Sequence, residues 1–320
     1  MQEKRAVKAA WPFYLAAVLV AAIIAGAVAQ SFVGESLAVL GIPDPGWPTT
    51  FGLPALRGAG WMLAALAVGS FLFAAFLIPP RIVGQDLNGA PLTVDGHIAS
   101  RTGAWASAGL ALVGIVMIPL VLSDVSGEPL ANVIFEAAAW STAIEQVQES
   151  QVWLIVAAFA AVVAAGGFTA STWWPQVALL AGAGIAIMPL ALTGHSATGG
   201  NHDYGTNSFI WHLTFMLVWV GALMALVAHG RRLGPNLEPA VRRYSNIALF
   251  AFLAMLVSGL INGAIRIQLT ELTDYDYGWV LIAKAVGLLA LGVLGYWHRQ
   301  RTIPALSKDP KAFTRLAAVE

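Results

Sequence analysis

Eight stretches of about 20 mostly apolar residues divide the chain. A helix that crosses a bilayer needs about this length, because the hydrocarbon core is about 30 Å thick and each residue advances a helix by about 1.5 Å. Of the 320 residues, 58% are hydrophobic and 11% are charged, which leaves too little polar surface to cover a water-soluble globule of this size. We therefore predict an all-α polytopic membrane protein with about eight transmembrane helices. The expected spans are residues 11–30, 58–78, 104–123, 152–170, 174–193, 209–229, 247–267 and 279–297.

The charges predict how these helices are oriented, because cytoplasmic loops of membrane proteins carry an excess of lysine and arginine. With the N-terminus inside, 14 of the 17 cations fall on the cytoplasmic side, and most acidic residues fall in the external loops. We therefore expect both termini to be cytoplasmic. Residues 301–320 would form a cytoplasmic segment that leads into a further helix, since the chain ends on an apolar helical pattern.

The longest external connection contains a second kind of helix. Around residues 130–146, apolar side chains recur at helical spacing opposite polar ones. This pattern predicts a short amphipathic helix that lies on the external membrane surface. We assign it to an N-terminal four-helix region, residues 1–172, which precedes a second four-helix region from residue 173 to residue 300.

Three of the six histidines gather where the fifth span ends and the sixth begins. His195 and His202 flank a glycine-rich turn, with Asp203 beside them, in a segment that we expect to be a loop from residue 196 to residue 206. His212 lies in the apolar segment that follows, where an imidazole needs a partner to offset its lost hydration. This clustering predicts a metal or haem site at a membrane edge.

The neighbouring methionines favour copper over other metals. Met216 follows His212 by one helical turn, and Met188 precedes His195 by seven residues, so each shares a helix face with its histidine. Imidazole nitrogen and thioether sulfur together suit copper, and sulfur favours the cuprous state. The chain has no cysteine. The predicted metal ligands are His195, His202, Asp203, His212, Met216 and Met188.

Structural roles remain open for the same residues. His212 could donate to a carbonyl inside the bundle, and His202 and Asp203 could be ordinary loop residues. Methionines inside helices more often pack than bind a metal.

Polar side chains in the last two spans form a supporting set. Asn262 and Arg266 are one turn apart, and Lys284 lies inside the final span, close enough to its outer end to reach acidic loop residues. Polar and charged groups within a membrane are expensive to bury, so these positions are functional candidates.

Several short segments together resemble a known family. They are Gly194–Ala197, Trp211–Leu213, Trp219–Leu223, Ser258–Asn262 and Leu281–Lys284. They resemble the membrane domain of the copper resistance protein D (CopD/PcoD) family, over about residues 174–300. The overall form is similar to the actinobacterial type, in which this domain is fused to a cytochrome c oxidase assembly-like domain.

The resemblance implies what the chain does. Residues 173–300 would be a CopD-like copper-handling bundle, to which His195 and His212 carry over directly. The implied function is copper transport or handling across the cytoplasmic membrane for copper homeostasis, extending to copper supply for cytochrome c oxidase. The implied partners are the copper ion, an extracytoplasmic copper donor protein, and cytochrome c oxidase or its assembly factors.

Two other functions remain open. A b-type haem electron carrier could use His195 and His212 near the outer surface with His229 and His298 near the inner one. We expect the last two instead to extend the basic inner face, because arginines adjoin them at the water boundary. A non-transporting oxidase-assembly scaffold is the other alternative. We expect neither an enzyme nor a nucleic-acid partner, since the sequence shows no phosphate-binding loop, nucleophile elbow or zinc-protease helix.

Overall fold

A computed structural model describes residues 11–40, 43–78, 89–192, 202–230, 232–267, 270, 272–274 and 276–306. The side chains of residues 31–40, 192, 202–205, 266, 276 and 277 lie outside the described set. The described chain is helical, without strands, and eight of its helices are long and apolar enough to cross a membrane. The predicted fold class and the multi-pass membrane location are therefore confirmed. The orientation of the termini stays a prediction.

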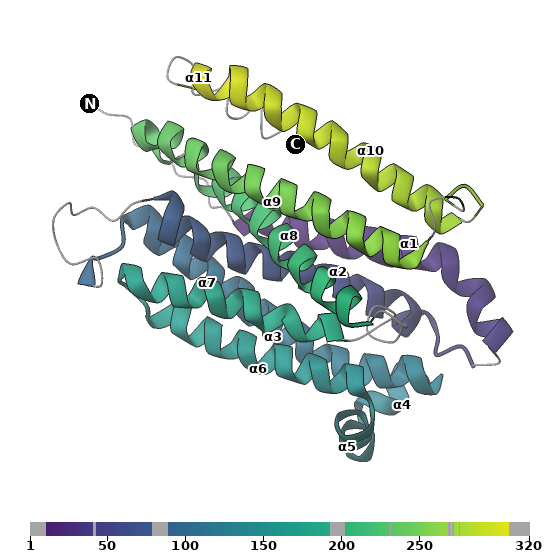
Figure 1. Ribbon diagram of the computed structural model, residues 1–320. Coiled ribbons are helices and arrows are strands. Elements are labelled where there is room, and N and C mark those ends of the chain that lie inside the picture. Colours follow the sequence, from purple (N-terminus) through teal and green to yellow (C-terminus); the bar gives the residue numbers. More distant parts are fainter. Residues whose placement is uncertain are drawn as a thin grey trace.

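The long helices lie side by side in one bundle (Figure 1). Their bounds are α1 Trp11–Leu40, α2 Trp47–Leu72, α3 Val94–Ser126, α6 Gln148–Thr169, α7 Trp173–Ile187, α8 His202–Gly230, α9 Leu237–Arg266 and α10 Asp276–Trp297. Shorter pieces are α4 Leu130–Ile134, α5 Ala137–Gln146, α11 Ile303–Ala305, π-helical turns at Phe73–Leu77 and His298–Thr302, and 3₁₀ turns at Met188–Leu192 and Gly234–Asn236.

Local chemistry accounts for several helix ends. The Thr93 hydroxyl accepts from the Gly96 N–H at 3.0 Å and caps the start of α3. Gly127, with φ +70°, ends the same helix in the left-handed region that glycine adopts without strain. Helix α7 stops at Ile187, and Pro189 lies in the tighter 3₁₀ turn that follows.

Helix α2 is the centre of the bundle and the most buried of the eight spans. It packs against α1, α3, α7 and α8. Gly69 of α2 and Gly221 of α8 make the closest of these crossings, because a Cβ added at either glycine would overlap a backbone carbonyl of the other helix. Two facing glycines therefore let the α2 and α8 backbones touch, as small residues do in membrane helix pairs.

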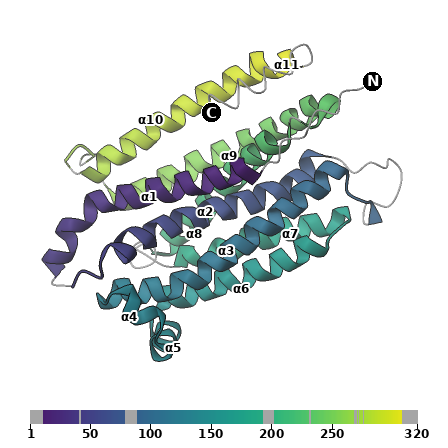
Figure 2. The ribbon, with the colours of Figure 1, turned by 180° about the vertical axis from the view of Figure 1, so that it is seen from behind.

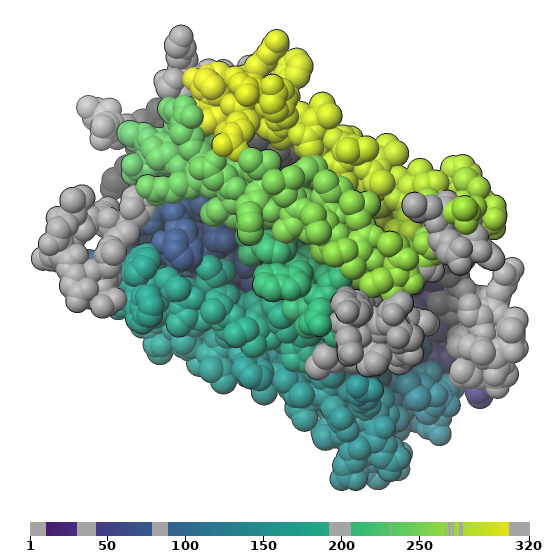
Figure 3. Space-filling model, viewed as in Figure 1, coloured from purple at the N-terminus to yellow at the C-terminus, as the bar shows by residue number. Residues whose placement is uncertain are grey.

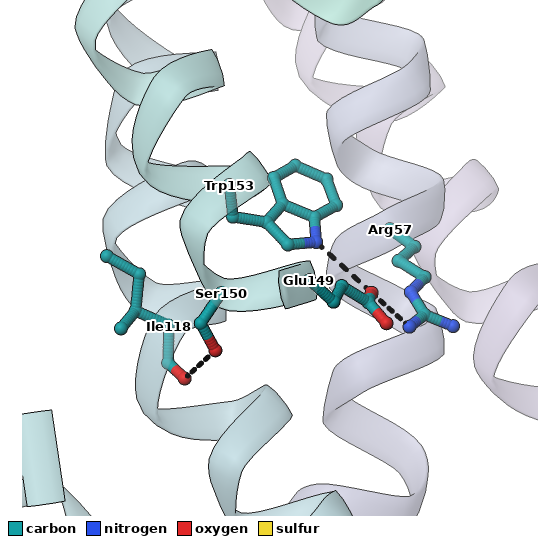
Figure 4. A network of polar contacts seen from close by, with 5 residues as sticks. All are labelled: Arg57, Ile118, Glu149, Ser150 and Trp153. Atoms are coloured by element: carbon teal, nitrogen blue, oxygen red, sulfur yellow. Dashed lines mark hydrogen bonds and ion pairs between the residues drawn. The ribbon is translucent and has the colours of Figure 1, made fainter. Parts of the chain in front are cut away.

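A polar network ties α2, α3 and α6 together near the predicted external end (Figure 4). Arg57 of α2 forms an ion pair with Glu149 of α6, and the same carboxylate accepts from the Trp153 indole N–H at 3.3 Å. The Ser150 hydroxyl donates to the Ile118 carbonyl of α3 at 3.3 Å. These bonds hold polar groups in place that would otherwise be costly at this depth.

The external amphipathic helix predicted near residues 130–146 is instead two short helices. The chain is extended at Glu136, between α4 and α5, and the Trp140 indole donates to the Ile134 carbonyl at 3.0 Å across the break. This hydrogen bond satisfies a carbonyl that the end of α4 leaves without a helical partner. Helix α5 projects from the bundle, as Figures 1 and 2 both show.

The last two spans lie at the edge of the molecule. Helix α9 packs along α8, and α10 lies along α9 as the least buried span (Figures 1 and 3). Helices α7 and α8 both pack against α2, so the helices on either side of residue 173 share one packing centre. The division of the chain at residues 172 and 173 stays a prediction.

Candidate metal site

His212 is held on one side by a serine of the neighbouring helix. Its Nδ1 lies 3.0 Å from the Ser258 hydroxyl of α9. The two residues come from two of the short segments singled out in the sequence, which are 46 positions apart. The structure therefore brings these segments into direct contact through polar side chains.

The Ser258 hydroxyl fixes which nitrogen of His212 carries the proton. This hydroxyl lies 2.7 Å from the Ala254 carbonyl, one turn earlier in α9, and 3.2 Å from that of Met255. A carbonyl only accepts, so the single hydroxyl proton points toward α9 and the serine oxygen accepts from Nδ1–H of His212. The lone pair of the neutral ring is then on Nε2, the nitrogen that does not face Ser258. An imidazole oriented this way through its other nitrogen is the usual arrangement of a metal-binding histidine.

Two small residues complete the wall beside the imidazole. Gly259 lies beside the ring, and a Cβ placed there would make an ordinary contact, 3.7 Å from Cε1 of His212. Ser208, one turn above His212 on α8, donates to the Ser258 carbonyl at 3.0 Å and is buried. This second hydrogen bond fixes α8 against α9 at the level of the imidazole.

Lys284 belongs to the same layer of the membrane region. His212 and Lys284 each lie six residues inside the predicted outer end of their spans, and Ser258 lies seven residues inside the same end of its own. At 1.5 Å per residue all three are about 9–11 Å from that end. The ammonium is exposed, makes no ion pair with a described residue, and is close enough to act electrostatically on the His212 ring.

Three predicted ligands and one predicted supporting residue lie outside the described set. These are His195, and the side chains of His202, Asp203 and Arg266. Residues 196–206 were expected to be a loop, but α8 begins at His202, so His202 and His212 belong to one helix. Ten helical residues separate His202 from His212, which is about 15 Å along the axis.

Three other candidates have described surroundings. Met216 is half-buried and packs against the core around α2, Met188 begins the 3₁₀ turn after α7, and Asn262 is half-buried on α9. Within the described part of the chain, no three histidine or acidic side chains are grouped closely enough to hold a metal ion. The membership of these residues in a ligand set stays a prediction.

The expectation that His229 extends the basic inner face is wrong. The side chain is fully buried, its Nε2 lies 3.0 Å from the Tyr14 hydroxyl of α1, and its ring lies 5.2 Å from that of Phe73. The sequence suggested the water boundary because arginines follow His229 directly. The covering helix, α1, is 215 positions away and gave no local signal.

Comparison with known proteins adds the evidence for a family. Residues 238–320 match the family model of copper resistance protein D, and residues 48–203 match that of the copper resistance protein D-like N-terminal domain. Two separate stretches of the chain are therefore similar to copper resistance protein D-type domains. The copper transport protein CutJ of Bacillus subtilis (strain 168) is 32% identical over 136 residues, which cover 39% of this chain and 25% of CutJ. The chain thus spans about a quarter of that relative's length. No solved structure matches the chain significantly.

The two copper resistance protein D matches bracket the site. Ser258 and Lys284 fall in the copper resistance protein D match, His195 falls in the N-terminal-domain match, and His212 on α8 lies between the two. Helix α8 packs against α2, which lies in the N-terminal-domain match, and against α9, which lies in the copper resistance protein D match.

Proposed function

We propose that this chain binds copper through Nε2 of His212 and moves it across, or hands it over at, the cytoplasmic membrane. The hydrogen bond between His212 and Ser258 carries this proposal, because it leaves one imidazole nitrogen available for a metal near one end of the bundle. The similarity to copper resistance and copper transport proteins supports copper as the metal.

Copper would reach His212 in more than one step. Since His202 and Asp203 are about 15 Å from His212 along α8, they would receive the ion at the helix entrance and His212 would bind it next. A side-chain nitrogen cannot span that length, so one ion would not be shared by all of the predicted ligands. His195 and Met188 would contribute from the end of α7, and Met216 from the turn below His212.

Release from His212 would use the positive charge of Lys284. An ammonium acting on the imidazole weakens the binding of a cation there, which favours onward transfer over retention. Asn262 and Arg266 lie on α9 toward the same end and would contact the ion's path from that side. His212 would therefore bind copper transiently during transfer and would not store it.

The wider role is copper homeostasis, with delivery to cytochrome c oxidase as its extension. An extracytoplasmic copper donor protein would load the chain, and an oxidase subunit or assembly factor would receive the ion. A scaffold that presents copper without moving it would use the same His212 site. Copper flux across the membrane therefore distinguishes a transporter from a scaffold.

Two measurements test the proposal. Cells that express His195→Ala together with His212→Ala should accumulate copper differently from cells with the wild-type chain, whereas His97→Ala, at the other end of the bundle, should not differ. Equal copper accumulation and tolerance in all three would remove the proposal. In proteoliposomes a transporter gives copper flux, and a scaffold gives binding without flux.

A further inference from the structure

A cavity of about 420 Å³ lies between α8, α9 and α10, away from the layer of His212. Its walls are mainly apolar and rich in aromatic rings, and Trp219 of α8 meets Phe252 of α9 edge-on with 5.8 Å between ring centroids. Helix α10 closes the third side with Leu291, Gly295 and Tyr296. We refer to this space as the α10 groove.

The chemistry of the α10 groove does not suit a copper ion. None of its lining residues is a methionine, an aspartate or a glutamate, and only His298, at one end, has a nitrogen that could ligate. A cation in such an apolar space would lose its hydration without gaining ligands. A hydrocarbon chain would instead fill it favourably, because α10 is the least buried span and leaves the groove walls poorly covered.

Positive charge gathers at one end of the α10 groove. His298 and Arg299 line it there, and Arg299 is exposed and oriented by a 2.9 Å hydrogen bond to the Asn246 side chain. The described residues after α8, of α9 and after α10 add further arginines at this end against a single acid, Glu238, which is already paired with Arg242. The other arginines are Arg232, Arg243 and Arg301.

We propose that the α10 groove binds one anionic phospholipid from the leaflet at this end. An acyl chain would lie along Trp219 and Phe252, and the phosphate would contact Arg299 and His298. Membrane leaflets rich in anionic lipid attract basic residues at their surface. The combination of an apolar groove with a basic mouth matches both parts of such a molecule, and it explains how α10 is attached to α8 and α9.

The glycines of α10 offer a matched pair of variants for the acyl chain. A Cβ at Gly295 or at Gly287 meets nothing within 4 Å, so neither substitution strains the helix, but only Gly295 lines the groove. Gly295→Leu therefore fills the space, and Gly287→Leu adds the same side chain elsewhere. Arg299→Gln removes the positive charge that would contact the lipid head group, at an exposed position, and leaves the apolar part of the groove unchanged.

The experiment uses the full chain in nanodiscs that contain equal amounts of phosphatidylglycerol and phosphatidylcholine. After mild extraction into detergent, native mass spectrometry counts the lipid that stays bound. The expected result is one retained phosphatidylglycerol, which falls about fivefold in Arg299→Gln, since one basic residue near a membrane surface contributes about that factor. Gly295→Leu should lose the lipid to at least the same degree, and Gly287→Leu should retain it.

Three results would overturn the proposal. Phosphatidylcholine retained as well as phosphatidylglycerol would remove the role of the charge, and equal retention in Gly295→Leu would place the lipid elsewhere. A lipid-free chain that dimerises through α10 would assign the groove to a second copy. Copper binding measured on the same samples keeps this test separate from the proposed function, since His212 lies outside the groove.

Discussion

Replacing Ser258 by alanine tests whether copper binding requires the orientation of the His212 imidazole, because the imidazole itself is retained. The change removes the oxygen that accepts from Nδ1–H at 3.0 Å, and it leaves the imidazole itself in place. Without this acceptor the ring is free to rotate and to change tautomer, so Nε2 is no longer held as the metal-binding nitrogen.

The size of the effect follows from the bond that is lost. A hydrogen bond of this kind contributes about 0.5–1.5 kcal/mol, and partners that orient a metal-binding histidine typically change affinity by about 10–100-fold. Since about 1.4 kcal/mol corresponds to a factor of ten, the two estimates meet near a tenfold loss. We therefore expect Ser258→Ala to weaken cuprous binding by about tenfold and His212→Ala to weaken it further.

The assay is a titration of the purified chain with cuprous ion against a coloured chelator. Ser208→Ala is the matched control, because it removes a hydroxyl from the same helix pair that donates to the Ser258 carbonyl and not to the imidazole. In the His212→Ala background, Ser258→Ala should have no further effect. Wild-type affinity in Ser258→Ala, or an equal loss in Ser208→Ala, would refute the reasoning from the tautomer.

Three further predictions concern the packing and charges around the site. Gly221→Ala should lower the melting temperature of the chain by several degrees, because forcing a Cβ into the α2 backbone costs about 1–3 kcal/mol. Gly184→Ala is the control, since a Cβ there meets nothing within 4 Å and should leave the melting temperature unchanged. Equal melting temperatures of the two variants would contradict the close crossing. Arg57→Gln should cost at most about 1 kcal/mol in denaturant unfolding, because the ion pair is partly exposed, and should leave copper affinity unchanged; a loss of affinity would show that the network reaches the site. Lys284→Leu should strengthen cuprous binding in the same titration, because it removes a repulsive charge without adding a ligand. Weaker binding would instead make the lysine a supporting group.

The spans could be predicted because a bilayer imposes a length on any helix that crosses it. The apolar windows are therefore visible one at a time, without knowledge of their neighbours. The break at Glu136 could not be predicted, because both halves of the segment have helical spacing and only one residue between them is extended. Periodicity does not register a one-residue change of direction.

The candidate site was only half visible in the sequence. An imidazole in an apolar segment identified His212, but its partner, Ser258, is an ordinary small polar residue of another span, and only the packing of α8 on α9 joins them. The same reason explains the error at His229, whose partner Tyr14 is on the first helix. Residues that act across helices become visible once the helices are paired.

X-ray absorption at the copper edge tests the central claim most directly. The copper-loaded chain should show a nitrogen scatterer with the outer-ring pattern of an imidazole, and His212→Ala should lose this signal together with most of the bound copper. An unchanged spectrum and copper content in His212→Ala, or a wild-type chain that retains no copper, would contradict the account.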